Sequence, residues 1–143
     1  MKVLVVTFMA AMFLIGMGCT RAPSKKTDAS PAVTAPGVSE ISPQQARPAI
    51  EAAYSQFVDV RTPEEFASGH AERTINIPLD TLSANLDRLE KNEPVYLICQ
   101  TGHRSKQAAE TLTAAGFKQA ISVAGGTTAW QAAGLPTEPP AAN

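Results

Sequence analysis

The chain has only two cysteines, two histidines and one tryptophan among its 143 residues, and its formal net charge is -1. No block of basic residues is present, so the usual electrostatic signature of a nucleic-acid-binding protein is missing and we expect no nucleic-acid partner. His70 and His103 lie far apart in the sequence, and only one cysteine, Cys99, falls in the predicted folded part. These residues make a poor ligand set for zinc, so we predict no metal site, and we also expect no cofactor.

A long hydrophobic run occurs at the start of the chain, where residues 3–17 follow Lys2 and precede Cys19. The run is shorter than the ~20 residues that a membrane span needs, and its layout is typical of a secretory signal. The ending IGMGC resembles a bacterial lipobox, with glycine as the small residue before the cysteine. We therefore predict a signal peptide over residues 1–18 and a lipid on Cys19 that anchors the protein in the cell envelope, facing the periplasm or the exterior.

Two other interpretations of this segment stay open. In the first, the apolar run is an N-terminal membrane anchor that is never cleaved. In the second, Cys19 forms a disulfide with Cys99, which we favour less because Cys19 borders the apolar run and a flexible segment. Cys19 is followed by Thr20 and not by an aspartate. This resembles the pattern of bacterial lipoproteins that are sorted to the outer membrane.

Composition divides the rest of the chain into three parts. Residues 19–38 are rich in proline, alanine, serine, threonine and lysine and have too few large apolar side chains to offset the entropy of ordering, so we predict a flexible tether. Residues 39–136 form the predicted domain, and residues 137–143 a loose tail.

Within the domain, strand-like and helix-like patterns alternate. Ser42 and Pro43 are typical of a helix start, Pro48 weakens that helix, and Leu82, Leu86 and Leu89 share one face of another. The predicted strands cover residues 39–42, 56–60, 74–79, 94–99 and 118–125, and the predicted helices cover 43–54, 62–69, 80–91, 104–116 and 126–134. This order predicts an α/β fold with an open, mainly parallel sheet and helices on both faces.

The stretch VYLICQTGHRS at 95–105 places Cys99 at the end of the most apolar predicted strand and shortly before a helix. Ligands of open α/β sheets bind beyond the carboxyl ends of strands. Gly102 permits backbone angles that turn amide groups inward, and the helix adds its positive end. Together with Arg104 these groups favour thiolate over thiol, which predicts an anion-binding loop around a reactive sulfur. A small buried cysteine without chemistry is the alternative.

Four stretches, in the same order, resemble the rhodanese-like sulfurtransferase domain over about residues 39–136. One departure is AERT at 71–74, where the family usually has Ile-Pro-Gly-Ala, so we expect a changed turn near the pocket rim. The cysteine loop keeps the pattern cysteine-x-x-glycine-x-arginine-serine. The four stretches are FVDVRTPEEFASGHAERTINIPL (57–79), VYLICQTGHRS (95–105), AETLTAAGF (109–117) and VAGGTTAWQAAGLP (123–136).

The resemblance implies a sulfurtransferase with Cys99 as its nucleophile. Cys99 would carry a persulfide between a small sulfur donor, such as thiosulfate or a persulfide, and a thiol or cyanide-like acceptor. The loop would bind the donor's oxyanion, with Arg104 adding fixed charge. Asp59 and Arg61 end a strand and are expected at the pocket rim, and we expect a monomer. The predicted anion-binding residues are Gln100, Thr101, Gly102, His103, Arg104 and Ser105.

Two rival functions remain. A cysteine phosphatase or arsenate reductase also uses a loop from cysteine to arginine, but that loop is one residue longer than the QTGH segment of this chain. The other rival is a persulfide carrier or partner-binding module without multiple turnover, which shares the same chemistry.

The remaining candidate residues have structural interpretations. We predict an ion pair between Arg61 and Glu65. We expect His70 to fix the turn after Gly69, Trp130 to lie in the core, and the Gly125-Gly126 pair to shape a tight turn. His103 either tunes the charge near the sulfur or faces solvent.

Overall fold

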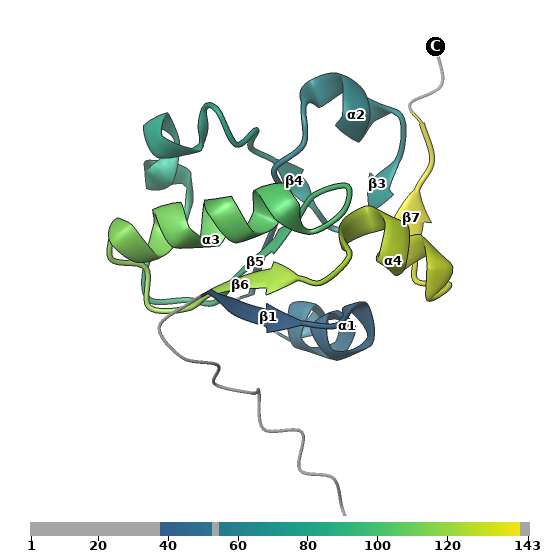
Figure 1. The fold of residues 1–143 in the computed structure, drawn as a ribbon, viewed down its shortest axis with the longest axis horizontal. Coiled ribbons are helices and arrows are strands. Elements are labelled where there is room, and N and C mark those ends of the chain that lie inside the picture. The colour runs from purple at the N-terminus through teal and green to yellow at the C-terminus, as the bar shows by residue number, and fades with distance from the viewer. Residues whose placement is uncertain (1–37, 53–54, 141–143) are drawn as a thin grey trace, which may run out of the picture.

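The computed structural model describes residues 38–52 and 55–140 (Figure 1). The predictions for the signal peptide, for lipidation at Cys19 and for the tether up to residue 37 lie outside the described residues. Within the described part, no helix is both long and apolar enough to cross a membrane.

A parallel sheet forms the centre of the domain, and its five strands follow the spatial order β1-β6-β5-β2-β4. All pairs of neighbours are parallel. The order places β5 in the middle, so the residue after its carboxyl end, Cys99, lies over the centre of one sheet edge. The strands are β1 (Ser39–Ile41), β2 (Gln56–Asp59), β4 (Ile75–Asn76), β5 (Val95–Ile98) and β6 (Ala120–Val123).

Helices cover both faces of this sheet, as predicted (Figure 1). Alternate residues of β5 supply two separate cores: Val95 and Leu97 pack with Leu112 of one helix, whereas Tyr96 and Ile98 pack with Trp130 of another. This confirms that Trp130 is a core residue. The α/β prediction is therefore confirmed. The helices are α1 (Pro43–Glu51), α2 (Pro63–Ala67), α3 (His103–Ala114) and α4 (Gly126–Ala132).

Helix α1 begins as predicted and continues further than its proline suggests. Ser42 caps it, and Ser42 and Gln45 form a reciprocal capping box with Pro43 in the first turn. The helix runs through Pro48 to Glu51. Tertiary packing offsets the missing hydrogen bond, because Ala46 and Ile50 are buried in the core that contains Trp130.

The segment 80–91 is not the single amphipathic helix that its leucine spacing predicts. It forms two 3₁₀ turns, η1 (Leu82–Ala84) and η2 (Leu86–Arg88), separated by Asn85. The side-chain amide of Asn85 donates to the carbonyl oxygen of Thr81 at 2.8 Å, a local bond that competes with the helix. Leu82 and Leu89 are nevertheless buried in the core beside α3. The leucine spacing therefore correctly predicted which side chains are buried, but not the type or length of the helix.

The tail does not begin as a loose segment at residue 137. Strand β7 (Thr137–Glu138) pairs antiparallel with β3 (His70–Ala71). The amide of Glu72 adds a bond to the carbonyl of Pro136 at 3.1 Å. The departure at residues 71–74 therefore begins in a small two-stranded sheet that holds the C-terminal segment against the domain. The residues after this strand form a turn, in which the Thr74 hydroxyl donates to the carbonyl of Ala71.

Candidate active site

Cys99 lies at the floor of a loop that joins β5 to α3. Gly102 has a φ of 95°, a left-handed conformation that glycine adopts readily. The N–H of Gly102 donates to the Sγ of Cys99, 3.1 Å away. Cys99 is only 1% exposed, so a reagent that reaches the sulfur must be small or the loop must move to admit it.

The loop holds further N–H groups that have no protein acceptor in the described part of the chain. Three of them belong to the first turn of α3, where no earlier helical carbonyl is available. The positive end of this twelve-residue helix lies at the same place. The loop can therefore bind an anion through its backbone. These free N–H groups belong to Gln100, Thr101, His103, Arg104 and Ser105.

The base of the loop rests on the start of α4. The amide of Thr127 donates to the carbonyl of Cys99 at 2.7 Å, and that of Thr128 to the carbonyl of Gln100 at 3.2 Å. Gly126 makes this approach feasible, because a Cβ there would collide with the carbonyl oxygen of Cys99. The sequence predicted a tight turn at the paired glycines, but not that the turn receives the cysteine loop.

Asp59 and Arg61 form a buried ion pair behind the loop and do not line its rim. Asp59 is 0% and Arg61 3% exposed. Two guanidinium nitrogens of Arg61 bind the Asp59 carboxylate at 2.7 to 3.0 Å, and the third donates to the side-chain oxygen of Gln100 at 3.3 Å. Arg61 also donates to the carbonyl of Gly69 at 2.9 Å. The pair therefore supports the loop from behind.

The predicted ion pair between Arg61 and Glu65 is wrong. Glu65 binds Arg104 instead, with two bonds of 2.7 Å. The hydrogen bonds from Arg104, and then the bond from the backbone of Thr62, hold the pKa of the Glu65 carboxyl at about 2, below its usual value of 4.5. The same pairing raises the pKa of Arg104. The positive charge of Arg104, which the sequence predicted to act on a bound anion, is therefore already paired with the carboxylate of Glu65.

The two histidines have different settings. His103 is exposed at the first position of α3. The Nδ1 of His70 donates to the carbonyl oxygen of Phe66 at 3.0 Å, and its ring stacks on that of Phe66 with centroids 3.6 Å apart. This arrangement agrees with a role in the turn after Gly69. Within residues 38–52 and 55–140, no group of three potential metal ligands lies together.

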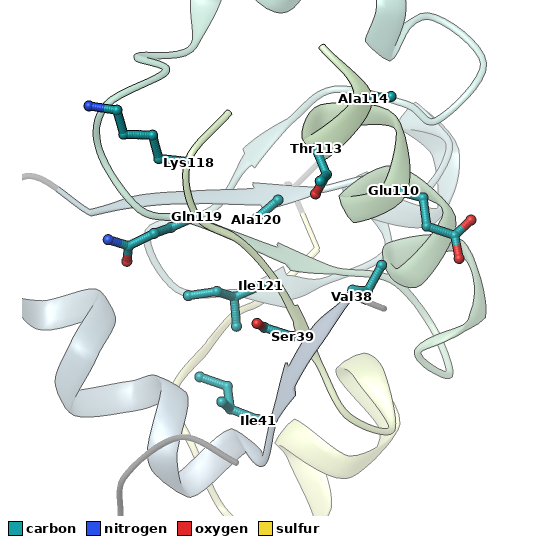
Figure 2. Close-up of a pocket in the computed structure, with 10 residues that line it drawn as sticks. All are labelled: Val38, Ser39, Ile41, Glu110, Thr113, Ala114, Lys118, Gln119, Ala120 and Ile121. Atoms are coloured by element: carbon teal, nitrogen blue, oxygen red, sulfur yellow. The ribbon is translucent and has the colours of Figure 1, made fainter. Parts of the chain in front are cut away.

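The hollows of the described surface include one beside Arg104 and one away from the cysteine loop. A small cavity of about 270 Å³ is lined by Arg104 and by residues that follow β2 and β4, among them Val60, Thr62 and Leu79. A larger groove of about 690 Å³ lies along β1 and the amino end of β6, against the second half of α3 (Figure 2). None of its lining residues belongs to the cysteine loop, so the larger hollow lies apart from the sulfur.

Comparison with known proteins agrees with this geometry. The family model described as Rhodanese-like domain matches residues 42–133. The thiosulfate sulfurtransferase GlpE of Actinobacillus pleuropneumoniae is 34% identical over 99 residues, which cover 69% of this chain and 92% of that protein. The chloroplastic thiosulfate sulfurtransferase 16 of Arabidopsis thaliana is 39% identical over 95 residues, covering 58% and 79%.

A crystal structure of a rhodanese-related protein from Thermoplasma volcanium superposes with a TM-score of 0.62 at 31% identity, covering 69% of this chain and 96% of that one. The family match includes the cysteine loop, its supporting glycines and the strands that position them. The chain therefore belongs to the family of rhodanese-like domains.

Proposed function

We propose that this protein is a sulfurtransferase that moves sulfane sulfur from a small donor, such as thiosulfate, to a nucleophilic acceptor through a persulfide on Cys99. Membership of the family and the names of the two sulfurtransferase relatives support this activity. The observation that carries it is the hydrogen bond from the Gly102 N–H to the Cys99 sulfur, inside a loop whose other N–H groups have no acceptor among residues 38–52 and 55–140.

The reaction divides into two balanced steps. The Cys99 thiolate attacks the outer sulfur of thiosulfate, a sulfur–sulfur bond forms, and sulfite leaves with the electron pair of the bond that breaks. A nucleophile such as cyanide or a thiolate then attacks the outer sulfur of the persulfide and returns Cys99 to the thiolate. Free backbone N–H groups stabilise negative charge on the bound donor and on the sulfur in both steps.

The arrangement favours sulfur over phosphate chemistry. The loop has four residues between Cys99 and Arg104, and a smaller ring of amides suits a sulfur atom better than a tetrahedral phosphate. The guanidinium of Arg104 is already engaged by Glu65, whereas a phosphatase would need its arginine to grip the phosphate oxygens.

Intact-mass measurement of the purified protein after incubation with thiosulfate tests the first step. We expect a gain of one sulfur atom that is absent in Cys99→Ser and that disappears when cyanide is added. No gain in the wild-type protein would contradict the proposal. Repeated turnover with excess thiosulfate and cyanide distinguishes an enzyme from a persulfide carrier, which would load once and release slowly.

We also propose that the domain is held at the cell envelope by a lipid on Cys19. Lys2, the apolar run and the lipobox-like ending support this location. Expression of the full chain in a diderm bacterium with labelled palmitate tests it. We expect label in the wild-type protein, none in Cys19→Ala, and accumulation of the uncleaved precursor in that variant. Equal labelling of both proteins would contradict it.

A further inference from the structure

A pair of hydroxyl groups is buried between β6 and the start of α3. Ser122 and Ser105 are both 0% exposed, and their Oγ atoms lie 2.9 Å apart. Among the side-chain hydrogen bonds of the described residues, Ser122 takes part in this one alone. A buried hydroxyl without a partner is destabilising, so the contact with Ser105 explains how a serine is accommodated at this core position.

Ser105 is the link between this pair and the reactive sulfur. Its Oγ lies 3.0 Å from the carbonyl oxygen of Gly102 and 3.7 Å from the Sγ of Cys99. Three polar atoms thus surround a hydroxyl that carries one proton. The carbonyl can only accept, so the direction of the bond between Ser105 and the sulfur depends on whether the sulfur carries a proton.

With Cys99 as a thiol, every donor and acceptor of this cluster can form a hydrogen bond. The S–H donates to Ser105, Ser105 donates to the Gly102 carbonyl, and Ser122 donates to Ser105. With Cys99 as a thiolate, the sulfur can only accept, and Ser105 can turn its proton toward it. The Gly102 carbonyl still accepts a hydrogen bond from the amide of Lys106 at 3.3 Å, so it keeps a partner when the Ser105 hydroxyl rotates away.

Ser122 donates to Ser105 in both states. A hydroxyl that accepts a hydrogen bond becomes a better donor, because the bonds in a chain polarise one another. In the thiolate state the donor chain runs from Ser122 through Ser105 to the sulfur, entirely within the protein interior.

We propose that Ser122 is a positioning residue for sulfur transfer, acting through the Ser105 hydroxyl to stabilise negative charge on Cys99. The proposal rests on the proposed sulfurtransferase function and assigns a role to a core strand residue outside the cysteine loop.

The test compares Ser122→Ala, Ser105→Ala and the double variant in two assays. One assay is the single-turnover rate of persulfide formation from thiosulfate, followed by intact mass. The other is the rate of Cys99 alkylation by iodoacetamide at neutral pH. We expect Ser122→Ala to slow both rates by about fivefold, the effect of one neutral hydrogen bond. In the Ser105→Ala background the same change should alter the rates less than about twofold, because the link to the sulfur is already absent.

The pair Ser122→Thr and Ser122→Val provides a matched control, since the two side chains have nearly the same shape and differ in the hydroxyl. We expect the threonine variant to react at close to the wild-type rate and the valine variant to resemble Ser122→Ala. Thermal melting of each variant separates reactivity from folding. Equal losses with threonine and valine, or an equal loss from Ser122→Ala in both backgrounds, would overturn the proposal.

The alkylation assay keeps this outcome separate from that of the proposed function. If thiosulfate fails to load the wild-type protein, the sulfurtransferase proposal fails, yet alkylation still reports whether Ser122 affects the sulfur. If thiosulfate loads normally and Ser122→Ala leaves both rates unchanged, only the role of Ser122 is rejected.

Discussion

The carboxylate of Glu65 accepts two hydrogen bonds from the guanidinium of Arg104, each 2.7 Å long. Glu65 also closes the capping box at the start of α2, where its side chain accepts from the amide of Thr62. One carboxylate thus ties α2 to the first turn of α3. Because Arg104 is matched in charge, we infer that the loop attracts anions mainly through its backbone N–H groups and the end of α3.

Replacing Glu65 by glutamine should lower stability in a pH-dependent way. The folded-state pKa of Glu65, about 2, lies below its ordinary value of 4.5, so its contribution is complete above that ordinary value and is lost as the pH falls toward 2. The pair is partly exposed, so we expect Glu65→Gln to reduce the free energy of unfolding at pH 7 by only about 0.5–1 kcal/mol. Urea denaturation at several pH values measures the difference.

Glu64→Gln is the matched control for this experiment, because Glu64 is the neighbouring carboxylate in the same first turn of α2. We expect it to change stability less than Glu65→Gln at pH 7. A difference between wild type and Glu65→Gln that stays constant down to pH 2 would show that the ion pair is not the source of the effect.

Replacing Arg61 by lysine should destabilise the domain although the charge is kept. Lysine cannot bind Asp59, Gly69 and Gln100 at once, as the guanidinium does. We expect the free energy of unfolding to fall by about 2 kcal/mol, since buried hydrogen-bonding groups lose their partners. Chemical denaturation measures it.

Arg47→Lys offers the comparison for a less buried pair, because Arg47 binds Glu51 and Glu72 near the surface. Its effect should stay within about 1 kcal/mol. Similar losses for the two lysine variants would mean that the burial of the Asp59–Arg61 pair does not matter.

Cys99→Ala should abolish sulfur transfer and leave the fold intact. The sulfur is the attacking atom in the proposed reaction, and alanine lacks it but keeps a small apolar side chain in the core beside α3. We expect a change in stability of about 1 kcal/mol. Thiocyanate formation and thermal melting are the two measurements. Activity above about a tenth of wild type would reject Cys99 as the essential nucleophile.

Gly126→Ala should be far more damaging than Gly116→Ala. Both glycines have positive φ values, 59° and 86°, so alanine adds comparable backbone strain of about 1–2 kcal/mol at either site. Only at Gly126 would the new methyl group strike the carbonyl of Cys99, whereas nothing lies within 4 Å of the position at Gly116.

We therefore expect Gly126→Ala to lower the free energy of unfolding by more than about 3 kcal/mol, and Gly116→Ala by roughly a third of that. In the Gly126→Ala variant, the free energy of unfolding, measured by denaturation, and the rate of persulfide formation should both fall. A Gly126→Ala variant with wild-type loading by thiosulfate would show that close contact between α4 and the loop is not needed.

The local sequence pattern predicted the fold class and the position of the cysteine loop. The alternation of apolar strands with helical segments predicted the parallel α/β sheet, and the cysteine at the end of the most apolar strand was correctly placed before a helix with Gly102 in the loop. These features depend on residues that are close in sequence, where periodicity, capping and glycine conformation act directly. Four matching stretches then sufficed to recognise the family.

Tertiary structure decided which side chains meet. Glu65 lies four residues from Arg61, which made their pairing a reasonable prediction, but the guanidinium of Arg61 turns back on Asp59 and leaves Glu65 to Arg104, 39 residues away. No local pattern contains that choice, because it depends on how the tertiary structure brings α2 and the first turn of α3 together. The same holds for Ser122 beside Ser105 and for Gly126 beneath Cys99: each residue looks ordinary in its own segment and acquires its role from the packing of a distant one.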